Sequence, residues 1–170
     1  NAALPIHSVG ELVAAAKSKP GGLTYASNGA GGASHLFAEM MKGMLGIELT
    51  HIPYKGNGPA YTDLMAGQVS LMFPNIATSL PYVKTGRMRS IGVGSKQRSQ
   101  IAPDIPTMIE AGVPGYEHVL WNAVFAPSGT PKNVIARLES ELTKAVNAPE
   151  LRERFATLGV EPAPKNSEQK

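Results

Sequence analysis

Short apolar runs alternate with amphipathic runs over most of the chain. Apolar positions recur with a helical period in residues 9–18, 34–45, 59–66, 76–85, 131–147 and 149–158, with one further helical turn at 107–111. More continuous apolar stretches predict strands at 23–27, 48–54, 69–74, 89–94, 118–126 and 160–163. The strands at 69–74 and 89–94 are apolar enough to be buried on both faces. The alternation predicts an α/β fold, with an open, mainly parallel sheet flanked by helices.

A turn of small residues follows the first predicted strand. It reads Ser27-Asn28-Gly29-Ala30-Gly31-Gly32-Ala33-Ser34-His35. Its three glycines leave backbone N–H groups uncovered by side chains, and the next helix points its N-terminal amides and positive dipole end into the turn. Such a turn binds an anion, either a phosphate or a carboxylate. His35 lies in the first helical turn, where it either faces the anion or makes a local capping contact.

The same turn nearly matches the dinucleotide-binding fingerprint GxGxxG, so a nucleotide- or phosphate-binding α/β enzyme domain is the alternative. That fold places an acidic residue at the end of the second strand to hold the ribose. Here the second strand ends in His51-Ile52-Pro53-Tyr54-Lys55, which contains no acid. The P-loop sequence and the GxSxG nucleophile elbow are absent as well. We therefore predict a binding protein and not an enzyme.

Two further loops follow predicted strands. Tyr54 and Lys55 come after the second strand, and Asn75 comes after the third. Because the carboxyl ends of parallel strands share one edge, where ligands bind, we expect these loops to converge with the glycine-rich turn. Together they offer Ser27, Asn28, Ser34, Tyr54, Lys55 and Asn75. Neutral donors with one cation suit holding a carboxylate, although Tyr54 could pack on the rim and Lys55 could be solvated. His51 lies mid-strand and is expected in the core.

The composition of the chain restricts the kinds of partner and cofactor that we predict for it. The 170 residues suffice for one domain with a full core, and the net charge of +3 is spread along the chain without a basic block. Nucleic acid is therefore not a predicted partner. There are no cysteines and the four histidines lack metal-ligand spacing, so the sequence predicts no cofactor or metal. No apolar stretch approaches the ~20 residues that a membrane span needs.

Several blocks of the sequence occur in the order in which they occur in one protein family. They are Tyr25–Leu36, His51–Gly56, Asp63–Val69, Met72–Asn75, Arg98–Ser99, Asp104–Thr107, Glu110–Tyr116 and Ala126–Pro131. Together they resemble the Bug, or TctC-like, solute receptors of tripartite tricarboxylate transporters. The resemblance implies a periplasmic receptor with a two-lobed, clamshell fold of the type II periplasmic-binding-protein class. Such a receptor captures a small carboxylate or related organic solute and works with the membrane subunits of the transporter.

The resemblance also implies that the chain is a fragment. Residues 1–170 would form a single α/β domain that resembles the second lobe over about 1–120, with a crossing strand and helices that return toward the first lobe over about 121–170. The first lobe would be absent, and the face exposed by its absence is expected to allow self-association. The ligand-binding positions implied are Ser27, Asn28, Gly29, Ala30, Gly31, Ala33, Ser34, His35 and Asn75. Ala33 stands where the family commonly has Thr or Ser, so one hydroxyl donor is missing.

Overall fold

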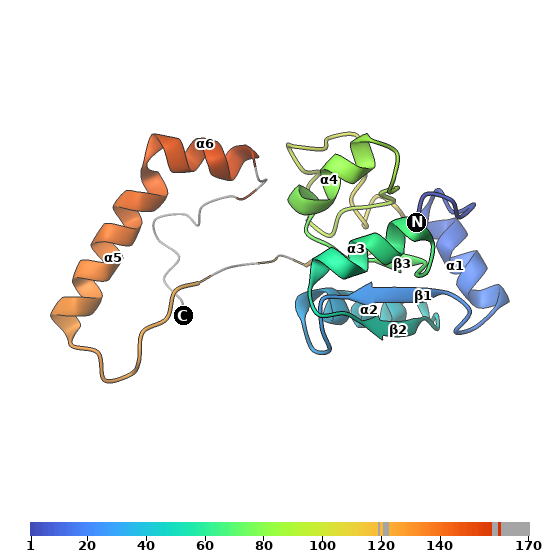
Figure 1. Ribbon diagram of the computed structural model, residues 1–170, viewed down its shortest axis with the longest axis horizontal. Coiled ribbons are helices and arrows are strands. Elements are labelled where there is room, and N and C mark those ends of the chain that lie inside the picture. The colour runs from blue at the N-terminus through green and yellow to red at the C-terminus, as the bar shows by residue number, and fades with distance from the viewer. Residues whose placement is uncertain (119, 121–122, 158–159, 161–170) are drawn as a thin grey trace. The chain divides into compact units, whose positions relative to one another are not determined.

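The computed structural model describes residues 1–118, 120, 123–157 and 160, which fall into two compact units, 1–120 and 121–170 (Figure 1). In the described residues the first unit has a small sheet with four helices, and the second has two helices. None of the described helices is long and apolar enough to cross a bilayer. Because the candidate ligand loop lies in the first unit, that unit is described first.

A parallel sheet of three strands organises the first unit. Strand β1 (Thr24–Ser27) lies between β2 (Thr50–Pro53) and β3 (Leu71–Met72), and both neighbours run parallel to it. The register sets Tyr25 opposite His51 and Ser27 opposite Pro53. All three strands therefore end at one edge, and the loops that follow them start there. The predicted fold class, a parallel sheet flanked by helices, is confirmed.

Capping residues set the limits of the helices. The helices of the first unit are α1 (Val9–Ser18), α2 (Ala33–Leu45), α3 (Asn57–Ala66) and α4 (Ile76–Lys84). In α1 the Ser8 hydroxyl accepts the Glu11 N–H at 3.2 Å, an N-cap that satisfies one free amide. Helix α2 ends at Gly46, whose φ of +60° is the left-handed conformation that glycine adopts without strain. The six helices predicted from periodicity are all present, within two residues at each end.

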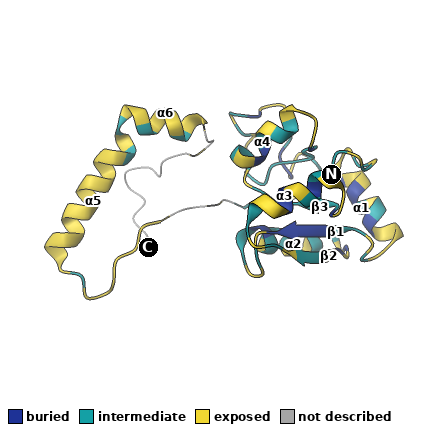
Figure 2. Cartoon of the chain, viewed as in Figure 1, coloured by how far each residue is buried: buried dark blue, intermediate teal, exposed yellow. Residues whose placement is uncertain are grey.

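Two apolar clusters cover the two faces of β1, which is coloured as buried in Figure 2. Tyr25 belongs to the first cluster, with side chains of α1, α2 and residues 108–116. Ala26 belongs to the second, with side chains of α3 and Met88. Both residues have 0% of their surface exposed. Because successive side chains of a strand point to opposite faces, β1 is buried on both sides, and the loop that leaves it starts from a rigid base.

Two strand predictions in the first unit need correction. The strand predicted at 69–74 is present only as β3, and its side chains are half-buried because β3 is an edge strand. The strand predicted at 89–94 is wrong: these residues are half-buried and make a single bridge, between Val93 and Thr107. A strand needs a neighbouring backbone along its length, and here the partner is an irregular segment that turns away after one pair of hydrogen bonds.

The segment from 86 to 118 is held by side chains and turns. The helical turn predicted at 107–111 is present as a hydrogen-bonded turn, closed by Ala111 N–H to Thr107 O at 2.9 Å. Thr107 and Glu110 cap each other's backbone amides, at 3.1 and 2.8 Å. Tyr116, with 1% of its surface exposed, donates from its hydroxyl to the Phe37 carbonyl of α2 at 3.1 Å. This segment therefore packs against the helix that carries the glycine-rich loop.

The second unit contains α5 (Lys132–Asn147) and α6 (Pro149–Thr157). The strand predicted at 118–126 is not formed by the residues of that range that the structure describes, and Val124 and Phe125 are 76% and 79% exposed. Residues 119, 121 and 122 of that range, and most of the strand predicted at 160–163, lie outside the described residues. An apolar run forms a strand only where another backbone pairs along it, and among the described residues of this range only His118 has such a bond, its N–H donating to the Gly94 carbonyl at 2.9 Å.

Candidate ligand-binding site

The loop between β1 and α2 owes its shape to its glycines. Gly29 and Gly31 have φ of +141° and +78°, a region that other residues rarely adopt. At Gly32 a Cβ atom would come within 2.8 Å of the Asn28 Oδ1 atom. The chain can therefore turn sharply after β1 and enter α2 with its amides bare, and Gly32, the N-cap, provides no side chain to cover them.

Side chains of the loop bond to the loop itself. The Ser34 hydroxyl donates to Asn28 Oδ1 at 2.7 Å and accepts the Asn28 N–H at 3.1 Å. The Ser27 hydroxyl accepts the Gly29 N–H at 3.2 Å and lies 3.1 Å from the Gly29 carbonyl, to which it donates. Ser27 and Ser34 are buried, at 0% and 5% exposure. Both hydroxyls thus fix the loop, and their protons are engaged within it.

Backbone amides remain available at the start of α2. The N–H groups of Ala30, Ala33 and Ser34 donate to no other described residue. They stand at the positive end of a 13-residue helix, where the backbone dipoles favour a negative charge. A carboxylate offers two acceptor oxygens and matches this set of donors. The geometry therefore supports an anion site built from main-chain groups.

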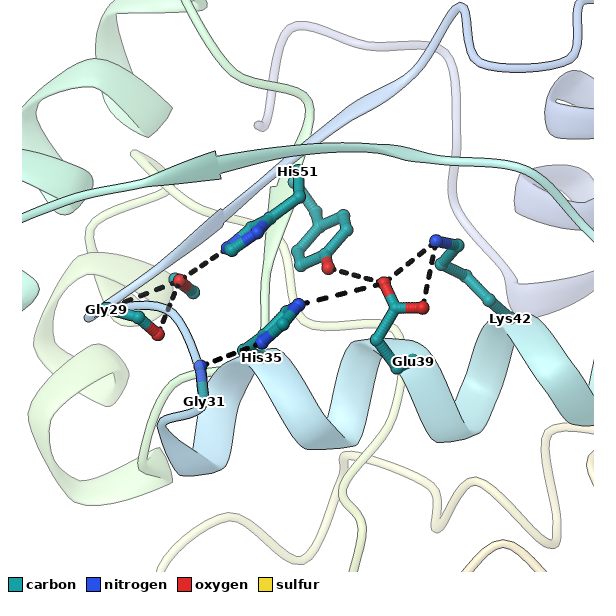
Figure 3. Close-up of polar contacts among 8 residues, drawn as sticks. Gly29, Gly31, His35, Glu39, Lys42 and His51 are labelled. Carbon is teal, nitrogen blue, oxygen red and sulfur yellow. Dashed lines mark hydrogen bonds and ion pairs between the residues drawn. The ribbon is translucent and has the colours of Figure 1, made fainter.

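His35 makes the local contact that was one of its two predicted roles. Its Nδ1 atom accepts the Gly31 N–H at 2.9 Å, so the ring ties α2 back onto the loop (Figure 3). This assigns Nδ1 as the unprotonated ring nitrogen, since an N–H group is aimed at it. His35 acts on the loop in this structure through Gly31.

His51 is a residue that sequence reasoning placed in the core and left out of the site. Its Nε2 atom lies 2.7 Å from the Ser27 hydroxyl oxygen, and its ring stacks on His35 with centroids 4.1 Å apart. The Tyr25 ring also stacks in this cluster, with its centroid 4.8 Å from that of His51 and 6.2 Å from that of His35. Burial, followed by the nearby His35, lowers the pKa of His51 below its usual value. What brings His51 into the site is the parallel register of β1 and β2, which sets it opposite Tyr25.

Glu39 and Lys42 of α2 complete this cluster (Figure 3). The Glu39 carboxylate accepts the Tyr25 hydroxyl at 2.6 Å and the Lys42 ammonium at 2.8 and 3.0 Å. It lies 4.0 Å from His35 Nε2. The Lys42 hydrogen bond, with that of Tyr25, holds the pKa of Glu39 below its usual value, while burial and Glu39 raise that of Tyr25. The carboxylate is thus largely neutralised by Lys42.

The other predicted site residues share the sheet edge with the loop, but their side chains are directed differently. The Tyr54 N–H donates to the Ser27 carbonyl at 3.0 Å, which brings the second loop beside the first. Its hydroxyl donates to Asp63 of α3 at 2.7 Å, and burial with this bond raises its pKa to about 12. Asn75 caps α4 by accepting the Ala77 N–H at 2.8 Å. Lys55 is exposed and pairs with no described residue.

Comparison with known proteins assigns the whole chain to one kind of protein. Residues 1–170 match the family described as the tripartite tricarboxylate transporter family receptor. A protein of Pseudomonas sp. (strain P51), encoded in the tcbD-tcbE intergenic region, is 40% identical over 154 residues, 90% of this chain and 46% of that protein. The chain spans about half the length of the curated relatives it matches.

Solved structures share the same backbone. R. palustris Rpa4515, solved with adipate, superposes with a TM-score of 0.87 at 35% identity, over 94% of this chain and 54% of that one. MatC from Rhodopseudomonas palustris, solved with bound malate, gives a TM-score of 0.88 at 30% identity, over 96% of this chain and 56% of that one. The predicted resemblance is therefore confirmed at the level of both sequence and fold.

Proposed function

Because the chain belongs to the tripartite tricarboxylate transporter receptor family, we propose that it forms part of a receptor that captures a small carboxylate and is not an enzyme. The observation that carries the proposal is the set of free amides of Ala30, Ala33 and Ser34 at the start of α2. These donors bind an anion and provide no proton transfer or nucleophile. Ser27, which could be mistaken for a nucleophile, is fully buried.

A dicarboxylate is the class of solute that we propose. Adipate and malate, bound to the two similar structures, each carry two carboxylates. The loop offers donors for one carboxylate end, with Asn28, Tyr54, Lys55 and Asn75 at the same sheet edge. Since the chain spans about half the length of its relatives, we propose that it holds one end of the solute. Of a binding free energy of about −8 kcal/mol, half would correspond to a Kd of about 1 mM.

Adipate should bind the 170-residue chain weakly and through its carboxylates. We expect an NMR titration to give a Kd of about 1 mM, with the largest shifts at the amides of residues 29–34. Hexanediol, which has the adipate skeleton without its charges, is the matched control and should cause no saturable shift. Shifts of equal size with hexanediol, or adipate shifts confined to other residues, would contradict the proposal.

The nucleotide-binding alternative gains no support from the fold or the relatives. The second strand ends at Pro53 and is followed by Tyr54 and Lys55, so the ribose-binding acid of dinucleotide folds is missing. Adding NAD or ATP to the same sample tests this alternative directly. Saturable shifts of the loop amides with either nucleotide, and none with adipate, would favour the enzyme alternative.

We place the intact receptor in the periplasm, with the membrane subunits of a tripartite tricarboxylate transporter as its partners. The support is the family, whose description names that transporter. The receptor would deliver its solute to those subunits. Both assignments concern the whole protein, of which this chain spans about half by comparison with its relatives.

We also propose that the 170-residue chain by itself pairs with a second copy through α5. Figure 2 shows α5 exposed over most of its length, and its apolar stripe consists of Val134, Ile135, Leu138 and Leu142, each between 38% and 48% exposed. These residues fall on one side of the helix, where an apolar surface is costly to leave in water. Pairing two such stripes would remove both from water.

Light scattering coupled to size exclusion should therefore give the mass of a dimer. Leu138→Lys puts a charge in the stripe and should shift the chain to the monomer. Ser140→Lys adds the same charge about 200° around the helix, on the opposite side, and should leave the dimer intact. A monomeric mass for the unaltered chain, or a dimer that survives Leu138→Lys, would rule this interface out.

A further inference from the structure

Two histidines from different elements hold the glycine-rich loop. His35 of α2 accepts the Gly31 N–H at 2.9 Å, and His51 of β2 contacts the Ser27 hydroxyl at 2.7 Å (Figure 3). That hydroxyl in turn bonds both the N–H and the carbonyl of Gly29. The two glycines with positive φ in this loop are thus each tied, directly or through Ser27, to an imidazole.

The bond from Gly31 requires an unprotonated Nδ1 on His35. If that nitrogen gained a proton, two N–H donors would face each other across 2.9 Å, and the bond would be lost. The charged ring would also lie against His51, with centroids 4.1 Å apart and planes within 8° of parallel. Protonation of His35 therefore acts on the conformation of the loop and on its stacking partner together.

The other groups that face His35 do not cancel this effect. They are Glu39 and Lys42 on α2, Tyr25 on β1 and His51 on β2. Glu39 lies 4.0 Å from His35 Nε2, but it is shared with the Lys42 ammonium at 2.8 Å and the Tyr25 hydroxyl at 2.6 Å. Its attraction for an imidazolium leaves the donor-to-donor contact at Gly31 unchanged, because that contact is on the other ring nitrogen.

We propose that His35, stacked on His51, is a positioning residue that holds the Gly29–Gly31 loop in its ligand-receptive shape only while its imidazole is uncharged. The proposal rests on the carboxylate site described above. It predicts that carboxylate binding weakens as the pH falls through the range in which histidine titrates. A histidine that touched the anion directly would give the opposite sign, since an imidazolium attracts a carboxylate. The direction of the pH dependence therefore separates the two roles.

The experiment is an NMR titration of the isotope-labelled 170-residue chain with adipate, at about pH 6 and about pH 8. We expect binding to be weaker at the lower pH by more than about twofold, because protonation of His35 breaks the Gly31 bond and binding requires the neutral ring. Without ligand, the Gly31 amide resonance should shift with pH along the same curve as the His35 ring. This second measurement, of the Gly31 amide resonance, needs no variant protein.

His35→Gln and His7→Gln are a matched pair. Glutamine at 35 keeps an acceptor for Gly31 and cannot gain a charge, so its adipate affinity should change less than about twofold between the two pH values. His7 is exposed and lies outside the loop, so His7→Gln should keep the pH dependence of the unaltered chain. Any effect of pH on adipate itself is common to all three proteins.

Equal or tighter binding at the lower pH, or an unchanged pH dependence in His35→Gln, would overturn the inference. A Gly31 resonance that does not follow the His35 ring would overturn it as well. If adipate binds at neither pH, the proposed carboxylate function fails, and the Gly31 resonance alone then decides whether His35 positions the loop.

Discussion

Replacing Gly31 with alanine is expected to weaken adipate binding about tenfold. Gly31 has a φ of +78°, and the left-handed conformation costs other residues about 1–2 kcal/mol. A Cβ atom there would meet nothing within 4 Å, so the cost is conformational and is not caused by a clash. The loop relieves the strain by rotating Gly31, which turns the neighbouring amides away from the ligand. About 1.4 kcal/mol corresponds to that tenfold loss, measurable by the same NMR titration.

Gly43→Ala provides the control for this loss. Gly43 lies inside α2 and is not among the glycines with positive φ, and a Cβ atom at this position would also meet nothing within 4 Å. Alanine should therefore stabilise the helix by up to about 1 kcal/mol and leave adipate binding unchanged. Unchanged binding in Gly31→Ala would mean that the observed loop shape is not needed for the ligand, and the amide site would have to be abandoned.

The shape of the glycine-rich loop could be predicted from the sequence because its determinants are local. The glycines at 29, 31 and 32 specify the turn, and the helix that follows specifies where the amides point. The roles of the Ser27 and Ser34 hydroxyls were harder to predict from the sequence. Ser27 and Ser34 were expected to face the ligand, whereas the structure engages both within the loop. Whether each hydroxyl donates to a ligand or to an acceptor within the loop depends on the positions of atoms a few ångströms apart. The spacing of residues in the sequence does not determine these positions.

His51 was missed for a related reason. A histidine in mid-strand is expected in the core, since most side chains there are buried. Its contacts come from the parallel pairing of β1 and β2, which sets it beside Tyr25 and above His35. The pattern predicts both strands but not their register, and a shift of one residue would have directed the ring to the other face.

The incorrect strand predictions at 89–94 and 118–126 show that an apolar pattern does not identify the pairing partner of a strand. Apolar side chains favour a strand, but the backbone hydrogen bonds come from a neighbour that the pattern does not identify. Residues 89–94 make one bridge, between Val93 and Thr107, and Gly94 accepts one further backbone hydrogen bond, from His118. Helices were predicted better because their hydrogen bonds are internal. The residues that end them, such as the N-cap Ser8 and the C-cap Gly46, can also be recognised in the local sequence.

Tyr116→Ala should destabilise the first unit by about 3–5 kcal/mol, the range found when a large buried aromatic side chain is truncated. Tyr116 has 1% of its surface exposed and packs in the cluster that contains Met41 and Val113. Removing the ring leaves a cavity between α2 and residues 107–116, and it removes the hydroxyl that donates to Phe37. Urea unfolding, followed by circular dichroism, measures the change in the free energy of unfolding.

Phenylalanine variants separate the ring from the hydroxyl. Tyr116→Phe keeps the packing and loses one hydrogen bond, so about 1 kcal/mol is expected. Tyr82→Phe removes a hydroxyl that bonds no described residue and should cost less than about 0.5 kcal/mol. A loss below about 1 kcal/mol in Tyr116→Ala would show that residues 107–116 are not part of the cooperative core. The expected large loss would mean that an irregular segment, held by side chains instead of a sheet, anchors the helix whose first amides form the proposed carboxylate site.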